Sequence, residues 1–388
     1  MMPLAVLFAW LAAPSAAAHW VGTWATAPQR VERRNLPPSP LARSTLRQTF
    51  KISLGGRELR VHVSNRFGNA PLVIRAASIA LPAGPGAIVR SSQRALRFHG
   101  RRSITLAAGA AAVSDAFRFR ARPRSELTVS IYFGAAPTRV TGHPGSRQTS
   151  YLESGNFIAA ASLPHPETAD HWYILTGVDV RAPAAAAAIV AFGDSITDGH
   201  GTTTNGNDRW TDDLARRLAA MPATRHLAVL NAGIGGNCVL RPCLGPAGIA
   251  RYRRDALQPA GVRWVLLFEG VNDIGTAHRS VAQALIAAYH RMIVEAHARH
   301  LRIYGATITP FGGSFYDSPA HQADWRIVNH WIRHSRAFDA VLDFAEAARN
   351  PLAPMRLLPA DDLGDHLHFN PAGYARLALS IPLQLFQP

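Results

Sequence analysis

The sequence predicts an antiparallel β-sandwich followed by an α/β domain whose five parallel strands form a doubly wound sheet. Short β-type runs fill the first half of the chain, and an alanine-rich stretch at 181–188 interrupts that pattern. After it, apolar runs alternate with segments of helical period. The chain has 388 residues, of which 48% are hydrophobic, so it can bury the cores of two domains.

The β-type runs lie between residues 45 and 179 and are separated by turn residues, for example at 55–56 and 82–86. Segments 60–64 and 117–120 alternate apolar and polar side chains, as strands with one buried face do. We expect residues 19–182 to form a sandwich of the jelly-roll type. The expected strands are 45–54, 59–64, 72–81, 103–106, 116–120 and 127–133.

The second half of the chain has the pattern of repeated strand and helix units. Apolar side chains recur at three and four residues in the segments between or after the runs, as in Trp210, Leu214 and Leu218. Such alternation predicts a parallel, doubly wound sheet over residues 183–388. The expected strands are 189–192, 227–230, 264–268, 303–308 and 341–344.

The net charge is +16, but its distribution does not indicate a nucleic-acid protein. Lys51 is the only lysine, and the arginines are scattered along the chain rather than gathered in a run. A specific nucleic-acid site would concentrate this charge on one stripe or helix face. We therefore expect a solvated basic surface and no specific nucleic-acid partner.

The N-terminus has the pattern of an export signal. An apolar run is followed by small residues, and Ala16 and Ala18 give the A-x-A spacing of a cleavage site after Ala18. We therefore expect residues 1–18 to be a signal peptide and the protein to be secreted or periplasmic. No other stretch is apolar and long enough to span a bilayer.

The two cysteines, Cys238 and Cys243, are close together in the chain. In an exported protein such a pair forms a local disulfide, whereas in the cytosol it would remain as two free thiols. Two thiols without a neighbouring histidine are a poor zinc site.

Polar and titratable residues follow four of the predicted strands. They occupy segments 193–199, 231–237, 269–273 and 365–370. Ligands of an open α/β sheet bind beyond the carboxyl ends of its strands, so these segments are expected to meet at one edge. A lone Gly-Asp-Ser tripeptide is an ordinary turn, but four such segments together indicate an active site.

These four segments, in this order, resemble the conserved blocks of the SGNH, or GDSL-type, hydrolases. The matching residues are Gly-Asp-Ser at 193–195, Gly-Gly-Asn at 235–237, Gly-Val-Asn-Asp at 270–273 and Asp-His-Leu-His at 365–368. The N-terminal half is similar to the β-domain of one bacterial branch. The resemblance implies a flavodoxin-like α/β domain and a serine esterase.

Ser195 is the expected nucleophile, because a serine hydroxyl beside an imidazole base can attack an ester. His368 is the expected base, since Asp365 precedes it by three residues and can orient it. His366 is the rival base. The resemblance assigns the oxyanion hole to the backbone N–H groups of Ser195 and Gly236 and to the side chain of Asn272.

The remaining polar residues are expected to have supporting or surface roles. Asp194 and Asp273 are expected to brace their loops by accepting backbone hydrogen bonds. Three further histidines are expected on the surface or at the pocket rim, of which His143 is the one with a claim to line the cleft. The three are His143, His200 and His278.

No metal or cofactor is expected. The acidic and histidine residues at 361–368 crowd on one loop without a partner cluster, which favours a solvated acidic turn. The glycines at 233–236 lack the third glycine of a dinucleotide-binding loop.

We therefore expect an exported carboxylic-ester hydrolase that acts through an acyl-enzyme. The β-domain and the basic surface suggest an acetylated polysaccharide as substrate, and a small-molecule ester is also open. One alternative is a lipase or thioesterase that acts on acyl chains. Another is a carbohydrate-binding protein with a vestigial hydrolase domain, which the complete set of site residues disfavours.

Overall fold

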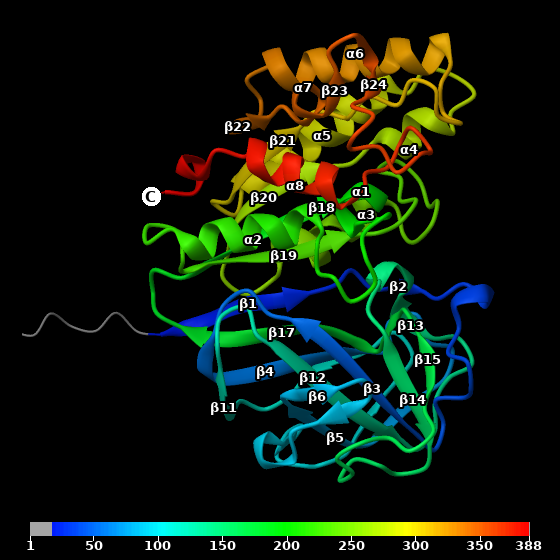
Figure 1. Ribbon diagram of the computed structural model, residues 1–388, viewed down its shortest axis with the longest axis vertical. Helices are drawn as coiled ribbons and strands as arrows, with labels where there is room; N and C mark the ends of the chain where they lie inside the picture. The colour runs from blue at the N-terminus through cyan, green and yellow to red at the C-terminus, as the bar shows by residue number, and fades with distance from the viewer. Residues whose placement is uncertain (1–17, 388) are drawn as a thin grey trace, which may run out of the picture.

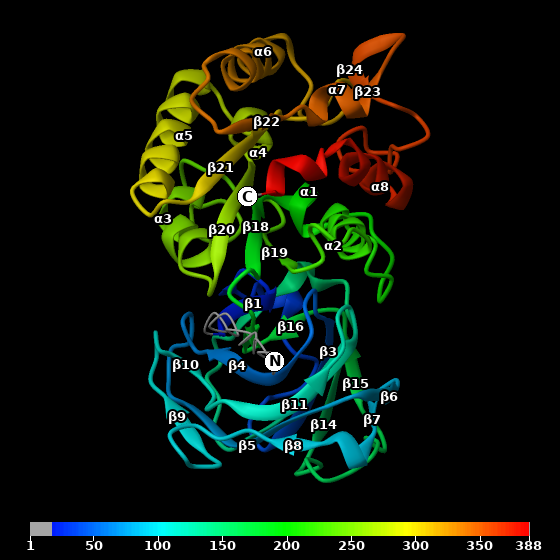
Figure 2. The ribbon, with the colours of Figure 1, turned by 90° about the vertical axis from the view of Figure 1, so that its left-hand side faces the viewer.

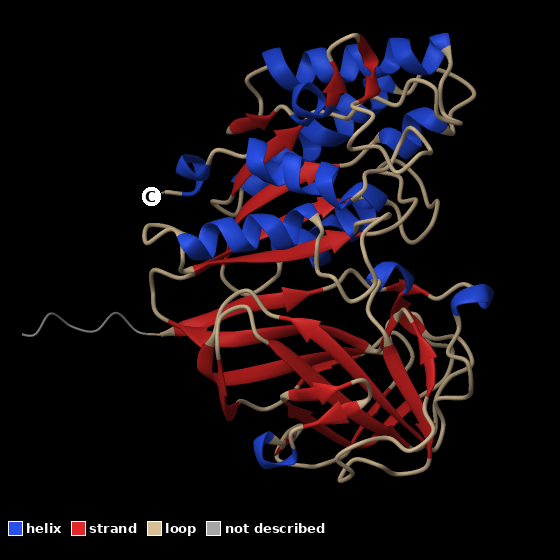
Figure 3. Cartoon of the chain, in the orientation of Figure 1, coloured by secondary structure: helices blue, strands red, loops and turns tan. Residues whose placement is uncertain are grey.

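The computed structural model describes residues 18–387, and its two halves differ in texture. Figure 1 shows strands in the lower half and alternating strands and helices in the upper half, and Figure 3 shows the same division by element type. The predicted signal peptide, apart from Ala18, lies outside the described residues. Within 18–387, no helix combines the length and the apolar character needed to cross a bilayer.

The first half contains two large antiparallel sheets around one apolar core, so the β-rich domain predicted from the sequence is confirmed. In β4, Val61 and Val63 are fully buried while Arg60 and His62 are partly exposed, which is the alternation that predicted this strand. The first sheet contains β1 (His19–Ala25), β17 (Leu175–Ala182), β4 (Gly56–Ser64), β10 (Ala111–Val113) and β11 (Phe117–Ala121). The second contains β15 (Glu167–Ala169), β14 (Ser150–Ser154), β3 (Ser44–Lys51), β12 (Glu126–Phe133), β5 (Leu72–Ala80), β8 (Arg94–Ala95) and β9 (Ile104–Leu106).

A third, small sheet lies at the edge of this domain that faces the upper half (Figure 1). It consists of β16 (Trp172–Tyr173), β13 (Thr141–His143) and β2 (Gln29–Arg30). The short helix η3 (Pro144–Ser146) follows β13 directly. These segments are the part of the β-domain that reaches the polar residues of the second domain.

The second half contains one parallel sheet of five strands, which confirms the predicted α/β fold. In spatial order the strands are β19 (Leu227–Gly233), β18 (Ala187–Gly193), β20 (Val262–Phe268), β21 (Arg302–Ala306) and β22 (Ala340–Leu342). The first strand along the chain, β18, therefore lies between the second and the third. Such a reversal of strand order opens a crevice at the carboxyl end of the sheet.

Helices cover both faces of this sheet, on its left and right in Figure 2. Side chains of β18 alternate between the two layers: Val190 and Phe192 pack into one core, and Ile189 and Ala191 into the other. The first layer contains α3 (Gly248–Tyr252), α5 (Ala282–His297) and α6 (Pro319–His334). The second contains α2 (Trp210–Ala220), α7 (Phe344–Ala348) and α8 (Pro371–Ser380).

The two domains are packed against each other through apolar and polar contacts. The chain passes between them through residues 183–186, which join β17 to β18. Val21 of β1 belongs to the same apolar cluster as Leu230 of β19. In addition, the Ser53 hydroxyl donates a hydrogen bond to the carbonyl of Val229 at 2.9 Å.

Candidate active site

Ser195 lies immediately beyond the carboxyl end of β18, at the reversal of strand order. It is the first residue of the short helix α1 (Ser195–Asp198). The preceding residue, Asp194, caps this helix because its Oδ1 accepts a hydrogen bond from the backbone N–H of Ile196 at 3.0 Å. This is the bracing role expected for Asp194.

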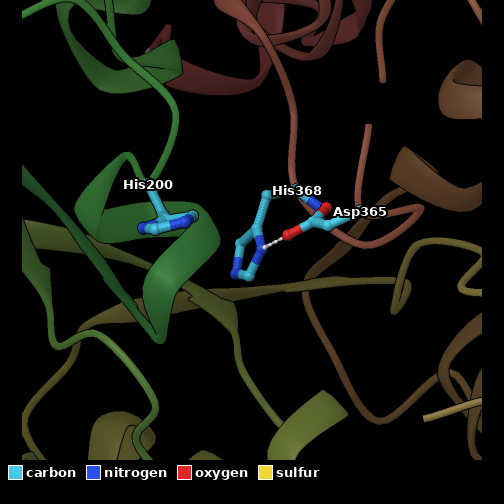
Figure 4. Close-up of side chains that lie close together, drawn as sticks. All are labelled: His200, Asp365 and His368. Carbon is cyan, nitrogen blue, oxygen red and sulfur yellow. Dashed lines mark hydrogen bonds and ion pairs between the residues drawn. The ribbon is translucent and has the colours of Figure 1, made fainter. Parts of the chain in front are cut away.

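Ser195, His368 and Asp365 form a continuous chain of hydrogen bonds. Ser195 Oγ lies 2.8 Å from His368 Nε2, and His368 Nδ1 lies 2.6 Å from Asp365 Oδ2, the contact drawn in Figure 4. Burial alone would raise the pKa of Asp365, but hydrogen bonds from the His368 side chain and backbone hold it well below its ordinary value. Asp365 therefore remains ionised and orients the imidazole toward the serine.

The rival base, His366, lies outside this arrangement. Its side chain is 49% exposed, and its Nδ1 lies 2.6 Å from Asp362 Oδ2. His366 is not among the residues that line the cleft around Ser195. The geometry therefore favours His368 over His366 as the base.

Gly236 reaches the same cleft from the loop that follows β19, and Asn272 reaches it from the short helix α4 (Val271–Gly275) after β20. Gly236 has φ +66°, a left-handed conformation that favours glycine. Asn272 Nδ2 donates to the carbonyl of Asn237 at 2.8 Å, and its Oδ1 accepts from the hydroxyl of Tyr316 at 3.0 Å. These two bonds fix which end of the Asn272 amide is the donor. The structure thus brings together all five residues that the sequence singled out.

The loop that carries Gly236 is held by a disulfide and by a carboxylate. Cys238 and Cys243 are joined, with their Cα atoms 5.6 Å apart, so the predicted disulfide is confirmed. Asp273 accepts hydrogen bonds from the backbone N–H groups of Val239 and Leu240, at 2.7 and 2.9 Å. Asp273 therefore braces this loop, as expected.

Arg251 and Glu269, which are buried behind the site, could not be identified from the sequence. Arg251 is fully buried and donates to the carbonyls of Gly193 and Ala232 and to Asn237 Oδ1, at 2.8, 2.7 and 2.7 Å. The Glu269 carboxylate lies 3.5 Å from Arg251 Nη2, and burial raises the pKa of Glu269 to about 8. In the sequence, Arg251 is one more arginine among many. Its role depends on tertiary contacts alone.

His200 was expected at the surface or rim, and it lies at the rim of the cleft beside the base. Its ring centroid is 4.3 Å from that of His368, and Figure 4 shows the two rings side by side. Partial burial, together with the charges of His368 and Arg147, lowers the pKa of His200 to about 4. His200 is therefore neutral at neutral pH.

His200, Asp365 and His368 each offer a metal-ligand atom, and these atoms lie within 4.8 Å of one another. However, both ring nitrogens of His368 are engaged, by Ser195 and by Asp365. A cation could reach His368 only by displacing one of these hydrogen bonds.

His143 was the histidine expected to line the cleft from the β-domain, and it lies behind the cleft instead. It is buried, and its Nε2 lies 2.8 Å from Asp198 Oδ1. His143 therefore contacts the helix that begins with Ser195 rather than the space in front of it.

The sequence model of the GDSL-like lipase/acylhydrolase family matches residues 191–376. Solved structures with a similar fold include a lipase/acylhydrolase from Enterococcus faecalis, which is 23% identical; the match covers 50% of this chain and 92% of that one, with a TM-score of 0.40. A lipolytic protein of the G-D-S-L family from Desulfitobacterium hafniense is 19% identical; the match covers 50% of this chain and 96% of that one, with a TM-score of 0.39. The aryl esterase of M. smegmatis is 16% identical; the match covers 52% of this chain and 99% of that one, with a TM-score of 0.42. No curated protein matches the chain.

The family match covers the segment that supplies Ser195, Gly236, Asn272, Asp365 and His368. The β-rich domain precedes the matched residues. Residues 191–376 are therefore a domain of the GDSL-like lipase/acylhydrolase family, and this chain is an ester hydrolase.

Proposed function

We propose that this protein is a serine esterase in which Ser195 is the nucleophile, His368 the general base and Asp365 the residue that orients the base. The observation that carries the proposal is the 2.8 Å contact between Ser195 Oγ and His368 Nε2. At this distance the imidazole can take the hydroxyl proton as the oxygen attacks.

In the proposed reaction, Ser195 Oγ bonds to the carbonyl carbon of the ester while its proton moves to His368 Nε2. The negative oxygen that forms accepts hydrogen bonds from the Ser195 and Gly236 N–H groups and from Asn272 Nδ2. The carbon–oxygen bond to the alcohol then breaks, and the alcohol takes the proton from His368. Water repeats the sequence on the acyl-serine and releases the acid.

The walls of the cleft favour a polar alcohol as the leaving group. The cleft has a volume of about 310 Å³, and the β-domain contributes Gln29, Glu32 and Asn35 to its lining. Glu32 accepts hydrogen bonds from Gln29 at 2.7 Å and from Asn35 at 3.1 Å, so these polar groups are held in place. From the hydrolase domain, Phe315 offers a side chain that is 72% exposed.

An exposed aromatic ring beside ordered polar side chains suits a sugar, which presents an apolar ring face and hydroxyl groups. We therefore place acetylated carbohydrate first among the substrates. An acyl-chain lipase or thioesterase is the second candidate, because Leu244 and Phe315 also offer apolar surface in the cleft. The basic net charge of +16 would favour anionic polymers.

A panel of nitrophenyl esters from acetyl to palmitoyl, assayed beside acetylated xylan, separates these candidates. We expect the protein to prefer the acetyl ester and to release acetate from xylan, and Ser195→Ala should lose both activities. Preference for long chains would favour the lipase. Unchanged turnover in Ser195→Ala would contradict the mechanism, and absence of turnover with retained xylan binding would favour a binding protein.

We also propose that the protein is exported, with cleavage after Ala18. The A-x-A spacing at Ala16 and Ala18 supports this, and so does the disulfide, which forms stably in an oxidising compartment. Expression of the full chain followed by N-terminal sequencing of the exported protein tests it. The mature chain should begin at His19, whereas an uncleaved chain retained in the cytosol would contradict the proposal.

A further inference from the structure

Two segments of the β-domain reach the helix that begins with the proposed nucleophile. These are β13 (Thr141–His143) and η3 (Pro144–Ser146), at the edge of the β-domain that faces the parallel sheet (Figure 1). Gly145 of η3 lies so close to Asp198 that an added Cβ would be 1.7 Å from Asp198 Oδ2. Only a glycine at position 145 therefore leaves room for the buried Asp198 carboxylate.

Asp198, the last residue of that helix, connects the β-domain to the oxyanion loop. Its carboxylate is buried, and Oδ1 lies 2.8 Å from His143 Nε2. Its other oxygen, Oδ2, accepts a hydrogen bond from the backbone N–H of Gly235 at 3.1 Å. Gly235 directly precedes Gly236, so the position of Asp198 determines where the Gly236 N–H group points.

His143 joins the buried Asp198 carboxylate to the backbone of the β-domain. His143 Nδ1 lies 3.0 Å from the carbonyl oxygen of Ala27, and Nε2 faces Asp198 Oδ1. Both neighbours are acceptors, so the two hydrogen bonds form together only when both ring nitrogens carry a proton. Burial alone would raise the pKa of Asp198, but the charges of His143 and Arg147 hold it below its ordinary value. Removing one partner would leave the other charge buried and uncompensated.

Arg147, which follows η3, makes a second connection to the site. Its Nη1 lies 3.6 Å from Asp198 Oδ2, and its Nη2 lies 3.3 Å from His200 Nδ1. A guanidinium only donates hydrogen bonds, so His200 Nδ1 must accept and carries no proton. Arg147 therefore keeps the ring beside His368 neutral, which prevents repulsion when His368 takes the serine proton.

We propose that His143 and Arg147 are positioning residues of the esterase site. By holding Asp198 from the β-domain side, they fix the Gly235–Gly236 backbone in the orientation that donates to the oxyanion. The β-domain is then part of the catalytic unit, and the hydrolase domain alone has an incompletely ordered site. This inference rests on the serine-esterase function proposed above.

The test compares His143→Ala, His143→Gln and Arg147→Ala with the full-length wild-type chain. The readouts are kcat and KM for nitrophenyl acetate, the affinity for a phenylboronic acid that forms a tetrahedral adduct with serine, and the thermal midpoint. Ser53→Ala is the matched control, because Ser53 bonds to Val229 across the same domain interface but makes no hydrogen bond to Asp198 and does not line the cleft.

Displacement of an oxyanion donor by about 1 Å reduces the rate of the chemical step by about 100-fold. We therefore expect His143→Ala to lower kcat by about 10- to 100-fold, with KM changed by less than about threefold. Boronate affinity should fall by a similar factor. His143→Gln retains a donor toward Asp198, so its kcat should fall less than that of His143→Ala. Arg147→Ala should also lower kcat. Ser53→Ala should keep wild-type kcat.

Wild-type kcat and boronate affinity in a folded His143→Ala or Arg147→Ala protein would overturn the inference. An equal loss of kcat in Ser53→Ala would also overturn it, because the effect would then reflect general loosening of the interface. If His143→Ala does not fold, His143→Gln and Arg147→Ala decide the matter by the same criteria. Full turnover in Ser195→Ala would instead overturn the proposed function. If turnover is lost in Ser195→Ala but kept in His143→Ala, only the present inference is contradicted.

Discussion

His368 Nδ1 lies 2.6 Å from Asp365 Oδ2, three residues earlier on the same loop. A second pair of equal length, His366 with Asp362, lies on the same loop, but the His366 side chain is 49% exposed. Only His368 continues to Ser195. The loop thus contains a proposed catalytic pair and, beside it, a pair of the same chemistry that can serve as its control.

Replacing Asp365 should reduce catalysis far more than replacing Asp362. Without Asp365 the imidazole loses its orientation and the stabilisation of its charged form, so Asp365→Ala should lower kcat by about 10²- to 10⁴-fold. Asp362→Ala should keep kcat within about twofold, since its partner does not contact the serine. Kinetics of nitrophenyl acetate hydrolysis measure both. Comparable losses in the two variants would contradict the assignment of His368 and Asp365.

Tyr316 should affect the rate through Asn272. Its hydroxyl donates to Asn272 Oδ1 at 3.0 Å, which keeps the amide nitrogen directed as a donor. Because one neutral hydrogen bond contributes about 0.5–1.5 kcal/mol, Tyr316→Phe should lower kcat by about 2- to 10-fold. Asn272→Ala, which removes the donor itself, should lower it by about 10²- to 10³-fold. If Tyr316→Phe lowered kcat more than Asn272→Ala does, Tyr316 could not act on the rate through Asn272 alone.

The buried Glu269 should make the protein less stable as the pH rises. Burial raises the pKa of Glu269 to about 8, compared with an ordinary value of 4.5. Between these values the folded protein keeps a proton that the unfolded chain has lost. The free energy of unfolding therefore falls with rising pH, by at most about 1.4 kcal/mol per unit for this group.

Glu269→Gln carries no titrating group, so its unfolding free energy should depend less on pH. Burial also raises the pKa of Asp194, to about 7, so Asp194 likewise makes the unfolding free energy fall as the pH rises. Asp194 is present in both the wild type and Glu269→Gln, so its contribution cancels when their pH slopes are compared. Urea unfolding at about pH 5 and about pH 8 measures the two slopes. Equal slopes would mean that Glu269 is already ionised in the folded protein.

Removing the disulfide should lower stability more than it lowers activity. Cys238 and Cys243 are five positions apart, and closing so short a loop stabilises the fold by about 2 kcal/mol. Asp273 holds the same loop through Val239 and Leu240. The Cys238→Ser, Cys243→Ser protein should therefore keep kcat within about tenfold. Urea unfolding and ester kinetics check this, and abolished activity in a folded variant would show that the bond itself orders Gly236.

The residues that could be predicted from the sequence are those that follow strand ends in short polar segments. Ser195, Gly236, Asn272, Asp365 and His368 belong to this group, because the carboxyl edge of a parallel sheet brings such segments together. The strands themselves were predictable from their apolar runs, and β4 from its alternation.

The supporting residues could not be predicted, because their partners are distant in the chain. Arg251 is 58 residues from the Gly193 carbonyl that it binds, Tyr316 is 44 residues from Asn272, and His143 is 55 residues from Asp198. No local pattern distinguishes such an arginine or tyrosine from one on the surface, and the sequence indicated His143 as a residue of the cleft rather than as the partner of Asp198. Their roles follow only from how the two domains and the helices pack.

The most direct test of the account is covalent labelling of the nucleophile with a fluorophosphonate. Ser195 Oγ would bond to phosphorus as fluoride leaves, and digestion followed by mass spectrometry locates the adduct. We expect a single adduct on the peptide that contains Ser195, formed much more slowly in His368→Ala and at the wild-type rate in His366→Ala. A protein that hydrolyses nitrophenyl acetate but has the adduct on another residue, or none on Ser195, would contradict it.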